Sequence, residues 1–332
     1  PLIGENRALV KAGLGALQKP HRQGVSALIH AAGLKPERIS AEEIGYILGP
    51  RLNAAGRIET AVGALELLTT RDVQRAGILA QKLDLQNQER QNQTRVIQAA
   101  AEQIALSRGK DKIVLFASHP DFSAGIVGLA ASRLVEQYYR PAIVAQQGNE
   151  WTRGSCRSIP EFHVTAALDR CADLLEHHGG HAAAAGFTVK NQNLIELINR
   201  LDEIAEAQLA GKELHPVLMA DAEISLDDLK PEILTFLDML QPTGYGNPKA
   251  LFISRNVKVN KFRAVGKDGA HLKLVLSGNR ITYDAIAFNQ GSWQDHMPTR
   301  IDLIYSFEIN EYNGRQSLQL NVVDLKPAGT LD

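Results

Sequence analysis

The spacing of hydrophobic residues divides the chain into segments with different hydrophobic periodicity. Over 1–48, and again over 61–108, apolar residues recur every three or four positions, as they do in amphipathic helices. Over 109–213, short apolar runs of strand length alternate with further helical stretches, and over 214–332 apolar and polar residues alternate along extended segments. The pattern predicts a helical part, then an α/β part, then a β part.

The segment 61–108 has the composition of one long helix. From Gln74 to Leu106 it contains no proline and a single glycine, Gly77. Its middle, 84–93, is polar on nearly every side, which is typical of a helix that crosses solvent between two bodies. We therefore expect a long connecting helix. A coiled-coil partner is the alternative, but the heptad pattern is weak.

The segment 109–213 alternates predicted strands with predicted helices. The strands are 112–117, 140–145, 151–158 and 185–190, and the helices are 123–138, 164–178 and 191–213. This alternation predicts an α/β sandwich with a mostly parallel or mixed sheet. Functional groups are then expected in the loops at one edge of the sheet.

The segment 214–332 contains five or six extended stretches and one short helix, about 226–240. Asn313-Gly314, between the extended stretches 301–309 and 317–325, is a strong signal for a β-hairpin. Several short strands with a single helix predict a small closed barrel, an OB-fold.

The charge of the chain is balanced overall but not locally. The net charge is −1, so a surface that binds phosphates has to concentrate its positive charge. Over 249–280 there are eight Lys and Arg residues and one Asp, a net charge of +7, with Phe252, Phe262 and Tyr283 in or beside the segment. Basic grooves with aromatic side chains hold single strands on OB-folds. The alternative is a solvated strand face with Phe252 in the core. The expected contacts are Lys258, Lys261, Arg263 and Lys273.

Cysteine usage and hydropathy narrow the class of protein. The chain has two cysteines, Cys156 and Cys171, which predicts no disulfide framework and fits a reducing cytoplasm. No apolar run approaches the roughly 18 residues that span a bilayer, and the first residues do not resemble a signal peptide. We expect a cytoplasmic protein that does not bind membranes.

A run of small residues follows the predicted helix 164–178. Gly179 and Gly180 are expected to end this helix, because glycine adopts backbone angles that a Cβ forbids. His181 and four alanines follow. Backbone N–H groups in such a run can approach a phosphate or a nucleotide closely. The alternative is tight packing of a helix on the sheet, with His181 facing solvent.

Two arginine-containing stretches are further candidates. The segment 49–57, predicted to be a loop, contains Arg51, Asn53 and Arg57, and an arginine fork can bind phosphate oxygens bidentately. The alternative is an interdomain loop whose arginines pair with carboxylates such as Glu59.

The segment 153–158 combines two hydroxyls and a guanidinium, Ser155, Arg157 and Ser158, which suits a terminal phosphate. Here the alternative is an edge strand with its polar residues directed outward.

These stretches together resemble one superfamily. Gly-Gly-His-x-x-Ala-Ala-Gly-Phe, at 179–187, resembles the signature of the DHH-associated domain of the DHH phosphoesterases. Gly-Pro-Arg-Leu-Asn-Ala-Ala-Gly-Arg, at 49–57, and Arg-Gly-Ser-Cys-Arg-Ser, at 153–158, resemble motifs of the RecJ branch. The three motifs stand in the family's order with family-like spacing, and the resemblance covers nearly the whole chain.

The resemblance implies part of a single-strand-specific 5′-to-3′ DNA exonuclease of DNA repair and recombination. Residues 1–60 would be the end of the DHH catalytic domain, and single-stranded DNA would be the partner. Mn²⁺ or Mg²⁺ would be bound by residues absent from this chain, because neither Asp-His-His nor Asp-x-Asp occurs in it. We therefore expect the chain to bind substrate and to be inactive alone.

The resemblance also implies roles for the candidate residues. His181 would lie near the reacting phosphate as the catalytic residue. The remaining contacts to the DNA and its 5′ end would be Arg51, Asn53, Arg57, Ser155, Arg157, Ser158, Gly179 and Gly180. The family often has glycine where this chain has Cys156. Because the cysteine side chain is larger, the site should be slightly narrower here than in family members with glycine.

Other functions remain open at this point. One is a non-catalytic module that binds single-stranded nucleic acid. Another is a phosphoesterase of short oligonucleotides or cyclic dinucleotides, although such substrates need no barrel. Editing domains of alanyl-tRNA synthetases share the Gly-Gly-His region but lack the 49–57 motif. A metal site at His177, His178 and His181 is not expected, because the predicted helix break separates them. Whether a single-strand-binding protein or a helicase is a partner stays open.

Overall fold

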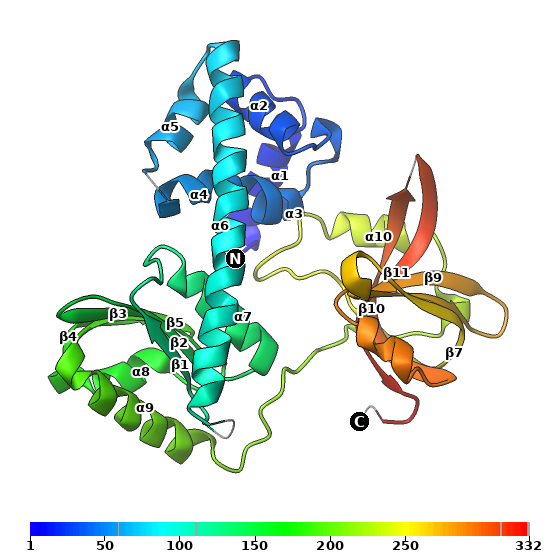
Figure 1. Ribbon diagram of the computed structural model, residues 1–332. Helices are drawn as coiled ribbons and strands as arrows, with labels where there is room; N and C mark the ends of the chain where they lie inside the picture. Colours follow the sequence, from blue (N-terminus) through cyan, green and yellow to red (C-terminus); the bar gives the residue numbers. More distant parts are fainter. Residues whose placement is uncertain (59, 110–111, 313, 331–332) are drawn as a thin grey trace. The chain divides into compact units, whose positions relative to one another are not determined.

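The computed structural model describes residues 1–58, 60–109, 112–312 and 314–330 (Figure 1). The chain divides into two compact units. Unit 1 comprises Pro1–Ala16, Ser40–Glu42 and Val217–Asp332, and unit 2 comprises Leu17–Ile39 and Glu43–Pro216. Within the described ranges, no helix is both long enough and apolar enough to cross a bilayer.

Unit 2 is built along a 35-residue helix, α6 (Val73–Ser107). The side chain of Asp72 caps it by accepting a hydrogen bond from the backbone N–H of Arg75. The first half of α6 packs against the short helices, and its second half packs against the sheet domain (Figure 1). The short helices are α2 (Gln23–Ala31), α4 (Gly49–Ile58) and α5 (Val62–Thr69). The long helix expected within 61–108 is present, but it begins only at Val73.

The segment 49–57 was predicted to be a loop, and this prediction is wrong. It forms α4, which continues directly from the π-helical turn η2 (Ile44–Leu48). Pro50 lies in the first turn of α4, where its missing N–H would be unpaired in any case. Ala54 and Ala55 are fully buried, so the small residues let α4 pack closely against α6. Glu59, the suggested ion-pair partner, lies outside the described residues.

The sheet of unit 2 has five strands in the order β1-β2-β3-β5-β4. The strands are β1 (Leu115–His119), β2 (Ala142–Gln147), β3 (Trp151–Arg157), β4 (Leu175–His181) and β5 (Ala184–Lys190). β1 and β2 are parallel and the other pairs are antiparallel. The mixed sheet confirms the predicted α/β fold.

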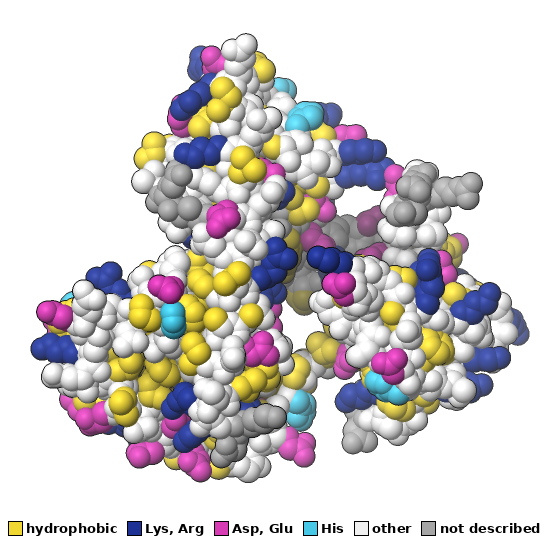
Figure 2. Space-filling model, viewed as in Figure 1, with side chains coloured by type: hydrophobic (Ala, Val, Ile, Leu, Met, Phe, Trp, Pro, Cys, Tyr) yellow, Lys and Arg dark blue, Asp and Glu magenta, His cyan; other side chains and the backbone are white. Residues whose placement is uncertain are grey.

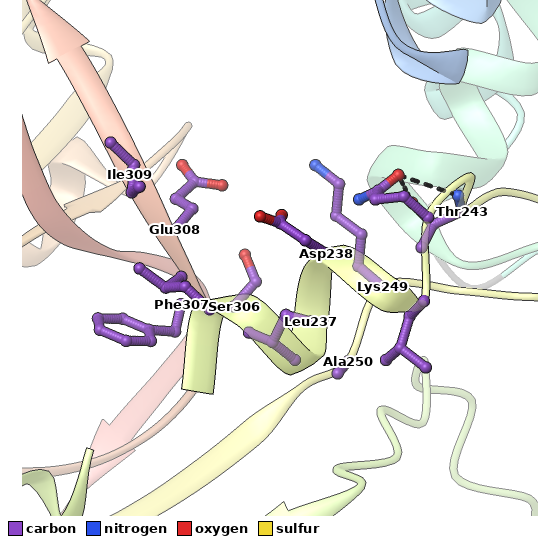
Figure 3. Close-up of a pocket in the computed structure, with 12 residues that line it drawn as sticks. Leu237, Asp238, Thr243, Lys249, Ala250, Ser306, Phe307, Glu308 and Ile309 are labelled. Carbon is purple, nitrogen blue, oxygen red and sulfur yellow. Dashed lines mark hydrogen bonds between the residues drawn. The ribbon is translucent and has the colours of Figure 1, made fainter. Parts of the chain in front are cut away.

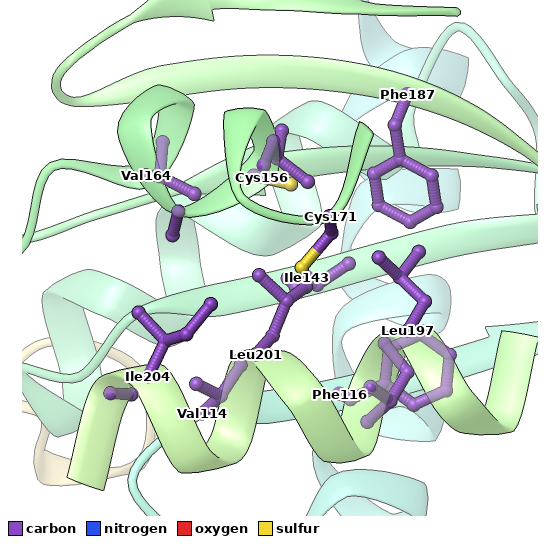
Figure 4. Close-up of a cluster of buried hydrophobic side chains, with 14 of the residues drawn as sticks. Val114, Phe116, Ile143, Cys156, Val164, Cys171, Phe187, Leu197, Leu201 and Ile204 are labelled. Carbon is purple, nitrogen blue, oxygen red and sulfur yellow. The ribbon is translucent and has the colours of Figure 1, made fainter. Parts of the chain in front are cut away.

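Helices cover both faces of this sheet. On one face, α6 and α7 (Val127–Tyr138) bury Leu115, Ala117 and Val144. On the other face, α8 (Val164–Asp169) and α9 (Leu194–Leu209) pack on Ile143, Cys156 and Phe187 (Figure 4). In β1 and β2, alternate residues thus enter two separate cores, whereas β3 and β5 contribute buried hydrophobic residues only to the core beneath α8 and α9.

The helix predicted over 164–178 is mostly absent. Only Val164–Asp169 is α-helical, a 3-10 turn covers Ala172–Leu174, and Leu175–His181 is the edge strand β4. The two glycines therefore do not end a helix. They pair with β5, and Gly180 has φ 153°; a Cβ there would lie 2.3 Å from the carbonyl oxygen of Ala184. Sheet pairing, which a helical periodicity cannot reveal, decides the structure here.

Unit 1 contains a closed five-stranded barrel, which confirms the predicted OB-fold. Its strands are β7 (Phe252–Val265), β8 (His271–Ser277), β9 (Thr282–Ala287), β10 (Arg300–Tyr312) and β11 (Arg315–Pro327). They pair in the order β10-β11-β9-β8-β7, and β10 also pairs with β7 to close the barrel. Asn313 of the predicted hairpin turn lies outside the described residues.

Short elements surround the barrel. The predicted helix 226–240 is realised as a 3-10 turn, Leu226–Asp228, and α10 (Ile233–Met239), which packs on the barrel core through Leu234 and Leu237. Between Val217 and the first strand of the barrel, the described residues form one short strand, β6 (Ala222–Glu223), which pairs with β7. Helix α1 (Gly4–Leu17) is joined to the segment before the barrel by Arg7, which donates hydrogen bonds to the carbonyls of Met239 and Gln241.

Candidate substrate-binding site

The register of three strands in unit 2 places polar and very small residues on one face of the sheet. Cross-strand partners in a sheet point to the same side. The resulting rows across β3, β5 and β4 are Arg153–Thr188–His177, Ser155–Gly186–Gly179 and Arg157–Ala184–His181. The middle of this face is bare because two of its central residues are glycines. A cavity of about 350 Å³ opens there.

The first turn of α7 lies directly against the Ser155 and Arg157 end of this face. A Cβ on Gly128 would stand 2.9 Å from Ser155 Oγ and 3.0 Å from Arg157 Nη2. Glycine therefore permits the contact. The positive end of the helix dipole and the guanidinium meet at one place, which favours an anion.

Arg157 is a half-buried cation without a counter-ion in the described part of the chain. Its Nη1 donates hydrogen bonds to Ser155 Oγ (3.1 Å) and to the carbonyl oxygen of Cys156 (2.8 Å). Burial lowers the pKa of Arg157; Cys156 opposes this shift, and the positive charge of Arg57 adds to it. A phosphate would supply the missing negative charge.

Arg57 and Arg90 extend the positive charge around Arg157. Arg57, at the end of α4, donates from Nη1 to the carbonyl oxygen of Gly125 (3.1 Å). Arg90, on α6, donates to Asn87, and its buried Nε has no hydrogen-bond partner among the described residues. Burial lowers the pKa of Arg90, and Arg57 and Arg133 contribute in the same direction. We call Arg57, Arg90 and Arg157 the arginine cluster.

Arg90 and Gly128 were not among the site residues predicted from the sequence. Arg90 stands in the polar stretch of the long helix, and its only sequence signal is that an arginine occurs there. Gly128 is the second residue of α7, a position where glycine is unusual enough to indicate close approach.

Arg51 does not join the arginine cluster. Its Nε forms an ion pair with Asp84 Oδ1 (2.8 Å), and its Nη1 donates to the carbonyl of Ile47. Asn53 is exposed on α4. The hydroxyl of Ser158 donates to the carbonyl of Phe162 (2.6 Å) and fastens the loop after β3. Of the arginines and hydroxyls predicted for the site, the structure brings together Arg57, Ser155 and Arg157.

The histidines of β4 separate into different environments. His181 is exposed, and its carbonyl accepts a hydrogen bond from Thr165 Oγ1 (2.7 Å). The lining of the cavity contains His177 and His178 rather than His181. His178 Nε2 lies 2.9 Å from Asp169 Oδ1. In the described ranges, no group of three or more His, Cys, Asp or Glu is arranged to hold a metal ion.

The predicted basic residues of unit 1 share the outer face of the barrel. Along β8, every second residue is buried, and Lys273 belongs to the outward set. Arg263 pairs directly with Lys273 across the strands, and Lys258 and Lys261 lie on the same face of β7. The ammonium Nζ of Lys273 lies 3.7 Å from Oδ2 of Asp284. Lys and Arg side chains gather along the outer side of the barrel (Figure 2).

The aromatic residues near this basic face differ in exposure. Phe262 is 43% exposed, but it pairs with Leu274 of the buried set of β8, so it lies on the opposite side of β7 from Lys261 and Arg263. Phe252 and Tyr283 belong to the barrel core, and the hydroxyl of Tyr283 donates to the carbonyl of Leu229. None of the three aromatic side chains therefore lies on the basic face itself, and Phe252 and Tyr283 serve the core.

Comparison with known families matches two segments. Residues 89–207 match the DHHA1 domain, and residues 220–324 match the RecJ OB domain. These segments contain the sheet of unit 2 and the barrel of unit 1.

Individual proteins match over nearly the whole chain. The single-stranded-DNA-specific exonuclease RecJ of Bacillus subtilis is 34% identical over 98% of this chain and 42% of its own length. The RecJ exonuclease of Salmonella typhimurium is 33% identical over 98% of this chain and 59% of its own length. A crystal structure of RecJ from Thermus thermophilus with Mn²⁺ has a TM-score of 0.87 and 28% identity, and covers all of this chain and 48% of that one. The chain thus spans about half the length of these relatives.

Proposed function

We propose that this chain, which is RecJ-like, is the substrate-binding part of a single-stranded-DNA-specific 5′-to-3′ exonuclease. The premise is that the chain joins a DHHA1 domain to a RecJ OB domain. The whole protein would act in DNA repair and recombination, and the two unpaired cysteines suit a reducing cytoplasm. In this proposal unit 2 holds the 5′ end of the strand and the barrel of unit 1 holds a more distant part.

The observation that carries the proposal is the environment of Arg157. Its half-buried guanidinium has hydroxyl and carbonyl partners but no described carboxylate within 4.0 Å, and it touches the first turn of a helix. A terminal 5′-phosphate would accept hydrogen bonds from Arg157 and Ser155, and Arg57 would add attraction. The two glycines in the row of Ser155, Gly186 and Gly179, would leave space for the first nucleotide.

His181 is proposed to contact the phosphate that reacts. It lies in the same cross-strand row as Arg157, on the same face of the sheet. Because Ala184 lies between the two residues in this row, His181 would contact the phosphate next to the one bound by Arg157. We place Gly179 and Gly180 beside it, where the backbone of the strand could approach. Arg51 and Asn53 on α4 remain proposed contacts to the DNA farther from this row.

We propose that the hydrolytic step needs a divalent metal ion that is bound by residues outside this chain. Solved RecJ structures contain Mn²⁺ or Mg²⁺. The described residues of this chain provide no cluster of His, Cys, Asp or Glu that fits such an ion. We therefore assign to this chain the binding and orientation of the strand and not the activation of water.

The barrel is proposed to bind the strand on its basic outer face. Lys258, Lys261, Arg263 and Lys273 would contact phosphates of the strand. Contacts to phosphates do not depend on the base sequence of the DNA, which suits an enzyme that degrades strands of any sequence.

A binding experiment with two variants tests this assignment. A fluorescent single-stranded oligonucleotide with a 5′-phosphate is titrated with the chain, with Arg157→Ala and with Arg200→Ala. Arg200 is the matched control, because it pairs with Asp173 and Glu196 on the other helical layer. We expect Arg157→Ala to weaken binding about ten- to a hundred-fold through the loss of charged hydrogen bonds.

The same preparation is incubated with Mn²⁺ and single-stranded DNA. No hydrolysis is expected. Hydrolysis abolished by EDTA would refute the assignment of the metal to residues outside this chain. Equal affinities of Arg157→Ala and Arg200→Ala would refute the phosphate site.

A further inference from the structure

A second cavity lies in unit 1, between α10 and β10, away from the basic face of the barrel. Its volume is about 260 Å³, and both apolar and charged side chains line it. Figure 3 shows the carboxylates of Asp238 and Glu308 and the hydroxyl of Ser306 pointing into the same space. Nothing in the proposed function uses these groups.

Two polar side chains that line this cavity, Ser306 and Asp238, make no side-chain hydrogen bond or ion pair in the described part of the chain. Ser306 is 8% exposed, and its hydroxyl makes no hydrogen bond there. No cation lies within 4.0 Å of Asp238 or Glu308 among the described residues, although Glu308 interacts with Asn321. Lys249 also lines the cavity, but its ammonium forms an ion pair with Glu42. The cavity therefore has an excess of negative charge and an unused hydroxyl.

The backbone beside the cavity is also open. β10 pairs with β11 along its whole length, but with β7 only from Arg300 to Tyr305. From Ser306 onward, its second edge has no strand partner in the described ranges. Ser306–Ile309 line the cavity, so the open edge runs along it. An unpaired edge of this kind can accept an added peptide strand.

Size and surroundings favour a peptide over a cofactor. A volume of 260 Å³ is below the roughly 300–1,000 Å³ of small-molecule sites and suits one inserted side chain. Leu240, which follows α10, is 43% exposed, Ile309 of β10 is 52% exposed, and both line the cavity. An apolar rim around an acidic pocket fits a segment with one cationic residue between apolar ones.

We propose that this cavity binds an extended peptide segment of a partner protein, which lies along the open edge of β10 and inserts one Arg or Lys side chain between Asp238 and Glu308. Ser306 accepts a hydrogen bond from the inserted cation. The flanking apolar residues of the peptide contact Leu237 and Ile309. This site is independent of the DNA-binding surfaces.

The test uses the 332-residue chain and two synthetic peptides, acetyl-Leu-Arg-Leu-amide and acetyl-Leu-citrulline-Leu-amide. Citrulline keeps the shape of arginine and removes its charge. Binding is followed by chemical-shift changes of backbone amides. We expect the arginine peptide to shift residues of α10 and of 306–311, and to bind about ten-fold more tightly than the citrulline peptide.

Variants locate the site. Glu308→Gln and Asp238→Asn are each expected to weaken the arginine peptide about ten-fold, whereas Glu232→Gln, just before α10, should leave its affinity unchanged. Unaltered binding of single-stranded DNA by each variant shows that it is folded.

Three results would overturn the proposal. The two peptides could bind equally, or the shifts could lie away from α10 and β10. In the third case, the chain would form dimers that Glu308→Gln dissociates, and a second copy of the chain would be the occupant.

Discussion

Single glycines set the distance between helix α7 and the sheet face beneath it. At Gly128, a Cβ would stand 2.9 Å from Ser155 Oγ and 3.0 Å from Arg157 Nη2, so these side chains would have to move. The geometry of the proposed phosphate site therefore depends on a residue that has no side chain.

Gly128→Ala is expected to reduce the preference for 5′-phosphorylated over 5′-hydroxyl single strands several-fold. The reason is displacement of Ser155 and Arg157, and the measurement is fluorescence anisotropy with both oligonucleotides. Gly77→Ala is the control, because a Cβ at Gly77 of α6 meets no atom within 4 Å. An unchanged preference in Gly128→Ala would contradict the assigned contact.

Both cysteines are expected to be unreactive in the folded protein. Cys156 and Cys171 are fully buried, and burial raises the pKa of Cys156 to about 12 and also raises the pKa of Cys171. At about pH 8 a disulfide reagent such as DTNB should modify neither thiol until the chain is unfolded. Because the folded pKa is raised, these thiols should also make stability fall as the pH rises above about 9. Rapid modification of either folded thiol would contradict the assigned burial.

The sequence predicts which residues are candidates for the site better than it predicts which of them lie close together. Ser155 and Arg157 are two positions apart on a strand, so their common face follows from strand periodicity. Arg51 and Arg57 were predicted in a loop, where no common face can be inferred. In a helix they point about 120° apart, which separates Arg51 from the arginine cluster. Arg90 approaches this cluster only through the packing of α6, which no local pattern shows.

The elements of the fold follow the sequence where hydrophobic periodicity is strong. The strands of the barrel and helices α7 and α9 were predictable for this reason, whereas α6 was predictable from its lack of proline. The errors at 49–57 and 175–181 share one cause: both segments are rich in glycine and alanine or lie beside such a run. Small residues carry little periodic signal, so tertiary packing decides whether they form helix α4 or strand β4.

Glu308 on β10 is expected to destabilise unit 1 at neutral pH. Burial raises the pKa of Glu308, with smaller opposing effects of Lys249 and Asn321. A raised folded pKa means that the charged form is disfavoured in the fold, so stability falls as the pH rises above the ordinary value near 4.5. Glu308→Gln should therefore unfold at higher urea concentration than the native chain at about pH 7, and the difference should shrink below about pH 4.5.

The fluorescence of Trp293 in unit 1 reports this transition once Trp151 of unit 2 is replaced by Phe. Glu232→Gln in the same background is the control. A lower urea midpoint of Glu308→Gln at neutral pH would show that Glu308 contributes to the fold instead of being held there for a ligand.

The molecule as a whole is nearly neutral, yet it contains two separate concentrations of positive charge. The net charge is −1, whereas the arginine cluster lies in unit 2 and the basic barrel face in unit 1. Binding of single strands should therefore arise from local and not from overall charge. Such binding weakens with salt in proportion to the number of phosphates that are contacted.

The most direct test of the account is the affinity of the chain for one oligonucleotide sequence with a 5′-phosphate or a 5′-hydroxyl, measured by fluorescence anisotropy over a series of salt concentrations. We predict that the phosphorylated strand binds more tightly at every salt concentration, and that the affinity for both strands falls as the salt concentration rises. Equal affinity for the two ends would contradict the site at Ser155 and Arg157, and binding that is insensitive to salt would contradict the basic face of the barrel as well.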